Sequence, residues 1–119
     1  VLHTHPQWST VFAMTHKNIP AVLTEQWVNL GGEIEVAEYA PAGDLKVGEY
    51  AVKALGDRKA ALMASHGAVC VGDRMDIAFA NAHYLENVAQ KVIFASLIGD
   101  LTPLEKDNIV ADHYMEGTA

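Results

Sequence analysis

The sequence predicts an α/β fold in which helices pack on a sheet. Segments with helical periodicity and segments with extended periodicity alternate along the chain, which is the pattern of that class. Half of the 119 residues are hydrophobic and 19% are charged, a balance typical of folded domains and not of disordered chains. The apolar runs, such as residues 60–64, are short and therefore indicate buried strands, not membrane spans. The expected strands are too few for an independent sheet.

The first part of the chain predicts a strand end followed by a helix. Residues 1–5 are interpreted as the tail of a buried strand and its exit. Pro6 suits the first turn of a helix, and apolar residues then recur at helical spacing to about residue 17. Residues 18–20 break this helix, and residues 21–30 are compatible with either type of element.

The middle of the chain predicts a strand and a second helix. Residues 33–37 alternate polar with apolar side chains, as a half-buried strand does. A turn is expected at residues 41–43, after which Asp44 caps a helix through Leu55 and Gly56 terminates it.

Residues 60–64 and 68–72 predict two short apolar strands, which form a hairpin or a bulged corner. Asp73 or Asp76 is then expected to cap the longest helix, which Gly99 stops. Pro103 is expected to begin a last helix that carries Tyr114. One face of the long helix is rich in small residues and is expected to be buried: Ala78, Ala82, Leu85, Ala89, Val92 and Ser96.

Charge and cysteine content narrow the class of protein. A formal net charge of −7 has the wrong sign for a nucleic-acid binder. The single cysteine, Cys70, excludes an internal disulfide framework and is expected to be an inert core thiol, so a cytoplasmic protein is expected. No membrane partner is expected.

Three histidines form the sharpest candidate site. His3 and His5 lie two residues apart, and on an extended backbone such residues point to the same face. His66 follows a distant strand and precedes Gly67, which lets a backbone approach closely. Three imidazoles with one open position are a ligand set of catalytic zinc. The alternative is that His3 and His5 are solvated or singly hydrogen-bonded histidines beside a strand end.

Several short motifs occur in order along the chain: His3-Thr4-His5-Pro6, Ile19-Pro20, Gly31-Gly32, Ala40-Pro41-Ala42-Gly43, and Ser65-His66-Gly67 with Val71-Gly72. Together they resemble the class II aldolase/adducin family, and within it the aldolases of fuculose-phosphate type. The resemblance covers only the second part of the family's domain, so residues 1–119 are expected to be the C-terminal portion of a single such domain, incomplete at the N-terminus. It implies a three-layer α/β/α sandwich around a mixed, mostly antiparallel sheet.

The resemblance also implies an activity. It implies that His3, His5 and His66 bind a catalytic Zn²⁺, a Lewis acid for the cleavage of a ketose 1-phosphate, similar to L-fuculose 1-phosphate, into dihydroxyacetone phosphate and an aldehyde. The family's acidic base and phosphate-binding loops precede the first histidine and are therefore outside this sequence. A homotetrameric lyase of carbohydrate metabolism is implied, and the small-residue face and exposed aromatic rings at Trp8 and Trp27 would agree with such assembly.

Two departures from the family pattern affect the catalytic residues. Thr24 stands where fuculose-phosphate aldolases carry a tyrosine, and Val28 stands where the family's 4-epimerases carry an aspartate. Glu25 is therefore considered as an acid or hydrogen-bonding group, with a solvated helix-start glutamate as the alternative. Tyr114 matches the position of a family tyrosine that donates a proton, and it could instead pack a terminal helix.

Three other functions are weighed against the aldolase. A pentulose-phosphate 4-epimerase or a ketose-phosphate dehydratase would keep the metal and change the reaction, although the short stretch between Gly32 and Ser65 favours an aldolase. A non-catalytic, adducin-like assembly module belongs to another class, and adducin heads lack the metal histidines that this sequence has.

Overall fold

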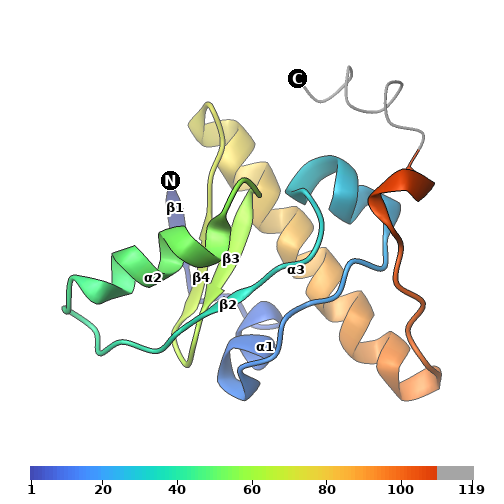
Figure 1. Ribbon diagram of the computed structural model, residues 1–119, viewed down its shortest axis with the longest axis horizontal. Coiled ribbons are helices and arrows are strands. Elements are labelled where there is room, and N and C mark those ends of the chain that lie inside the picture. The colour runs from blue at the N-terminus through green and yellow to red at the C-terminus, as the bar shows by residue number, and fades with distance from the viewer. Residues whose placement is uncertain (110–119) are drawn as a thin grey trace.

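A four-stranded mixed sheet forms the centre of the structure, a computed structural model that describes residues 1–109 (Figure 1). The strands lie in the order β1-β4-β3-β2. β4 pairs antiparallel with both β1 and β3, whereas β2 pairs parallel with β3, so the sheet is mixed and mostly antiparallel, as expected. The strands are β1 (Leu2–Thr4), β2 (Val36–Ala37), β3 (Ala60–Met63) and β4 (Gly67–Cys70).

Helices cover both faces of this sheet, and the three-layer α/β/α arrangement is confirmed. The side chains of β3 alternate between the two faces: Leu62 belongs to the core beneath two of the helices, while Ala61 packs against Ala54 on the other side. Figure 1 shows α2 on one side of the sheet and α3 on the other. The helices are α1 (Ser9–Thr15) and α3 (Met75–Ile98) on one face and α2 (Lys46–Leu55) on the opposite face.

The buried face of α3 largely follows the predicted pattern. Ala78, Leu85, Ala89 and Val92 are buried, and Ala82 is half-buried. Asn81 and Val88 are buried as well, and Asn81 Nδ2 donates to the carbonyl of Val71 at 2.8 Å. Ser96 is exposed, because the last turns of α3 extend beyond the sheet (Figure 1).

Several predicted bounds are wrong near the N-terminus. Val1 is 80% exposed, so it is not the buried end of a strand. The first helix begins at Ser9 and not at Pro6, and it ends at Thr15. The ambiguous segment ends in a single π-helical turn, η1 (Gln26–Leu30).

The strand expected at residues 33–37 is shorter than predicted. Only Val36–Ala37 pairs with β3, while Ile34 forms an isolated bridge with Ile19. The amide of Val36 donates to Asn18 Oδ1 instead of to a neighbouring strand. This segment crosses from one pairing partner to another, so the sequence alternation overstates the length of the strand.

The predicted helix caps are also partly wrong. Asp44 accepts a hydrogen bond from the amide of Lys46 at 2.9 Å, but Leu45 occupies the cap position of α2. Arg74 occupies the cap position of α3, and Asp76 pairs with the Arg74 guanidinium instead of capping the helix.

The C-terminal part of the described chain corrects the last helix. Pro103 does not begin an α-helix within residues 101–109, where a 3₁₀ turn, η2 (Lys106–Asn108), stands instead. Tyr114 lies outside the described residues.

The two tryptophans are half-buried, so the expectation that they are exposed is wrong. Trp8 packs on the core, with its ring centroid 5.7 Å from that of Phe94. Trp27 donates from Nε1 to the carbonyl of Leu104 at 3.0 Å. The large exposed apolar side chains of α3 are instead Met75, Phe79, Phe94, Leu97 and Ile98.

Cys70 lies in the core, as predicted, and is 1% exposed. Burial raises the pKa of its thiol to about 12, so the reactive thiolate is absent at neutral pH. Within residues 1–109, no helix combines the length and the hydropathy needed to cross a membrane.

A carboxylate from α3 caps the helix that follows the first two histidines. The amides of Trp8 and Ser9 donate to Glu86 Oε2 and Oε1 at 2.9 and 2.7 Å. These charge-assisted bonds satisfy two amide groups at the start of α1, which has no cap of its own.

We therefore expect Glu86→Gln to lower the free energy of unfolding by about 1–2 kcal/mol, because the amide group presents a donor to one of the two N–H groups. Urea denaturation measures this loss. Glu33→Gln, at an exposed glutamate, is the control and should change stability by less than about 0.5 kcal/mol. Equal effects of the two changes would contradict the role of Glu86 as a cap.

Candidate metal centre

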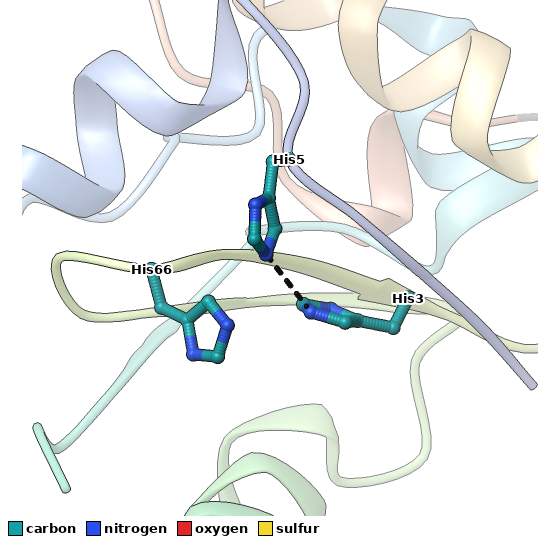
Figure 2. Close-up of side chains that lie close together, drawn as sticks. All are labelled: His3, His5 and His66. Carbon is teal, nitrogen blue, oxygen red and sulfur yellow. Dashed lines mark hydrogen bonds between the residues drawn. The ribbon is translucent and has the colours of Figure 1, made fainter. Parts of the chain in front are cut away.

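The strand register positions the three histidines on one face of the sheet. His3 pairs with Val69 of β4, and Val69 packs on the side of α2. Paired residues of neighbouring strands share a face, so His3 also points to that side. His5 lies two residues further along the same segment, and His66 lies in the turn that leads into β4. Figure 2 shows the three rings turned toward one another.

The three imidazoles that the sequence singles out lie close together. One nitrogen of each of His3, His5 and His66 lies within 4.8 Å of the others. The ring centroids are 4.9 Å apart in all three pairs. The Nε2 atoms of His3 and His5 are 3.1 Å apart and share a hydrogen bond (Figure 2).

This arrangement fits a tetrahedral metal ion. Zinc binds imidazole nitrogens at about 2.0–2.1 Å, which places two such nitrogens roughly 3.3 Å apart. The separation of 3.1 Å between His3 Nε2 and His5 Nε2 is close to that value, and a nitrogen of His66 lies within 4.8 Å of both rings' ligand atoms. His3 and His5 are exposed and His66 is half-buried, so a fourth position can face a substrate.

The backbone of β4 orients His3 for this role. Nδ1 of His3 lies 2.8 Å from the carbonyl oxygen of Ala68. A carbonyl oxygen only accepts hydrogen bonds, so Nδ1 carries the proton and Nε2 presents its lone pair to the cluster. Histidines that bind metals are held by this type of contact.

The surroundings of His66 favour its neutral form. Partial burial lowers the pKa of His66, and the neighbouring His3 and His5 lower it further. The neutral imidazole is the form that binds a metal, so His66 can act as a ligand at a lower pH than a solvated histidine.

Gly67 lets the first two histidines approach the turn. A Cβ atom at this position would meet the carbonyl oxygen of Thr4 and lie 2.8 Å from Cδ2 of His5. A glycine is therefore required where the segment of His5 crosses the start of β4.

The two residues predicted as catalytic lie elsewhere or outside the described residues. The structure does not bring Glu25 into the histidine cluster. Its Oε1 accepts from Asn87 Nδ2 at 3.0 Å and from Lys91 Nζ at 3.4 Å, both on α3. Tyr114 is not described, and Thr24 is exposed.

The sequence analysis missed groups that support the cluster. The carbonyl of Ala68 carries no residue-type signal, so no sequence pattern could reveal it. The Ser65 hydroxyl shares a hydrogen bond of 3.0 Å with His16 Nε2, and a serine and a histidine so far apart in sequence carry no spacing signal either.

Comparisons with known proteins agree with the fold. The sequence model of the family described as "Class II Aldolase and Adducin N-terminal domain" matches residues 1–93. The chain is 33% identical over 91 residues to the 5-methylthioribulose-1-phosphate/5-deoxyribulose-1-phosphate aldolase of Rhodospirillum rubrum, which covers 76% of this chain and 41% of that protein. It is 30% identical over 111 residues to the L-fuculose phosphate aldolase of Escherichia coli, which covers 93% and 52%.

A solved structure of L-fuculose 1-phosphate aldolase superposes on this chain with a TM-score of 0.87 and 28% identity, over 98% of this chain and 53% of that one. A 3-oxo-tetronate 4-phosphate decarboxylase of Escherichia coli is also similar, with 30% identity over 104 residues, 84% of this chain and 48% of that protein. The chain thus spans about half the length of these relatives.

Proposed function

Because the chain belongs to the class II aldolase and adducin family, we propose that it supplies the metal-binding part of a zinc-dependent aldolase. The substrate would be a ketose 1-phosphate similar to L-fuculose 1-phosphate, and the products dihydroxyacetone phosphate and an aldehyde. In this proposal residues 1–119 form the C-terminal portion of a single family domain.

The convergence of His3, His5 and His66 carries the proposal. Three imidazole nitrogen donors with a side open to solvent suit a catalytic zinc ion. Similarity to two proteins named as aldolases of sugar phosphates supports the same reaction class. When bound, zinc supplies a Lewis acid that polarises the carbonyl group of a ketose.

The chain's own residues hold and orient the site. His3 is fixed by the Ala68 carbonyl, and Gly67 leaves room for the His5 ring beside the turn of His66.

Retro-aldol cleavage breaks the C3–C4 bond of the ketose phosphate, removes the proton of the C4 hydroxyl and adds a proton to C3. In the reverse direction Tyr114 is the proposed proton donor to the aldehyde oxygen. Glu25 is a second proposed acid, whose carboxylate would have to leave Asn87 and Lys91.

We also propose that the complete protein is a homotetramer. The exposed apolar side chains of α3 support an assembly, because Phe79 is 57% and Leu97 is 78% exposed in the single chain.

The aldolase proposal predicts zinc-dependent release of dihydroxyacetone phosphate. The complete polypeptide, purified and loaded with zinc, would be incubated with L-fuculose 1-phosphate and with 5-deoxyribulose 1-phosphate. An enzyme that reduces dihydroxyacetone phosphate with NADH reports the product. We expect cleavage that a chelator abolishes and added zinc restores, because the three histidines contribute nothing to carbonyl polarisation without the ion.

Other products would identify the alternatives. The similarity to a decarboxylase favours one second candidate, decarboxylation of a 3-oxo acid phosphate, in which a carbon–carbon bond beside a carbonyl also breaks. Carbon dioxide released from 3-oxo-tetronate 4-phosphate without ketose cleavage would replace the aldolase by this reaction. An epimerised or dehydrated ketose phosphate would indicate a 4-epimerase or a dehydratase. A protein that binds no zinc and turns over none of these compounds would favour an adducin-like assembly module.

A further inference from the structure

The turn that carries His66 has a backbone conformation that its sequence does not favour. The amide of His66 donates to the carbonyl of Met63 at 3.0 Å, which closes a tight turn between β3 and β4. Ser65, the third residue of this turn, has a φ of 57°. Glycine or asparagine is typical of that position, because a Cβ atom crowds the backbone there.

Two contacts with the end of α1 hold Ser65 in place. Its amide donates to the carbonyl of Ala13 at 3.0 Å. Its hydroxyl shares a hydrogen bond of 3.0 Å with Nε2 of His16. His16 ends α1 and has a φ of 52°. Within residues 1–109, His16 and Ser65 are the two non-glycine residues with positive φ, and they are bonded to each other.

This contact joins the two segments that carry the candidate ligands. His3 and His5 stand just before α1, and His16 ends that helix. Ser65 directly precedes His66. The hydrogen bond between His16 and Ser65 therefore links the C-terminal end of α1, the helix that follows His3 and His5, to the turn that carries His66.

We propose that His16 is a positioning residue, which holds the Ser65 turn so that His66 meets His3 and His5 around a metal ion. His16 is not a member of the histidine cluster, and its Nε2 is engaged by Ser65. The inference rests on the proposed metal site and adds to it a group outside the cluster. Contacts that orient metal ligands affect affinity even though they do not touch the ion.

Glycine variants separate positioning from folding. Glycine adopts positive φ without steric strain, so His16→Gly and Ser65→Gly remove the hydrogen bond while they relieve the backbone at the same residue. We expect the thermal midpoint of the metal-free protein to change by less than about 3 °C. The zinc dissociation constant should rise about tenfold in each variant. The double variant should bind zinc about as well as either single variant, because one interaction is removed in all three.

Zinc affinity is measured by competition with a chromophoric chelator, on the complete polypeptide. His83→Ala, which removes another exposed histidine, is the matched control and should bind zinc like the unchanged protein. Unchanged zinc affinity in both glycine variants would overturn the role of His16, and so would a loss that merely parallels a lower midpoint of the metal-free protein. If the unchanged protein binds no zinc, the proposed metal site itself is wrong.

Discussion

Replacement of His66 by alanine is expected to abolish stoichiometric zinc binding. The cluster consists of three imidazoles, and its other two members cannot enclose the ion alone. Loss of a group that merely orients a ligand lowers affinity by about 10–100-fold, so loss of a ligand should raise the zinc dissociation constant by at least about a hundredfold. Cleavage of the ketose phosphate should fall to the level of the chelator-treated protein.

The fold should survive this change. His66 lies in a turn and is half-buried, and removal of its ring leaves the core under α3 untouched. The free energy of unfolding of the metal-free protein should therefore change by less than about 1 kcal/mol. His83→Ala is again the control for the loss of one imidazole. A His66→Ala protein that keeps one zinc ion per chain at unchanged affinity would contradict the three-histidine site.

Gly67→Ala is expected to have the second large effect, on both stability and metal affinity. The added Cβ would meet the Thr4 carbonyl and lie 2.8 Å from Cδ2 of His5, and the backbone of β1 cannot yield without losing its pairing with β4. Such overpacking lowers the free energy of unfolding by about 1–3 kcal/mol. Because the displaced group is the His5 ring, zinc affinity should also fall, by about tenfold or more.

Gly48→Ala is the matched control for this substitution. Gly48 lies within α2, and an added Cβ there would contact nothing within 4 Å. Alanine has a higher helix propensity than glycine, so this variant should be more stable than the unchanged protein by about 0.5–1 kcal/mol. Urea denaturation and zinc competition measure both variants. If Gly67→Ala were as stable as the unchanged protein and bound zinc as tightly, the close approach of His5 to the turn would be wrong.

The sequence alone determined those features that depend on neighbours along the chain. The hairpin of β3 and β4 follows from two short apolar runs around Ser65, and the end of α3 follows from Gly99. The shared face of His3 and His5 follows from the two-residue period of an extended backbone. Burial of Cys70 follows from its apolar surroundings in the sequence.

Tertiary structure decided the features that depend on distant partners. The bounds of α1 and the short β2 differ from the periodic patterns because Glu86, Asn18 and Ile19 bind the backbone there. The backbone amides at the start of α1 and at β2 donate to these distant partners, which no local sequence pattern reveals. The two tryptophans were expected to be exposed and are half-buried, because Trp8 packs on Phe94 and Trp27 donates to the carbonyl of Leu104.

His66 shows, at the candidate site, the difference between what the sequence determines and what the tertiary structure decides. Family resemblance pointed to His66 as a ligand, but its distance from His3 depends on the register that pairs His3 with Val69 across 66 residues of chain. The Ala68 contact depends on the same register, and the His16–Ser65 bond depends on the packing of α1 against β3 and β4. Residue types and the spacing of apolar side chains can be determined from the sequence. Hydrogen bonds between distant segments form only when the sheet brings those segments together.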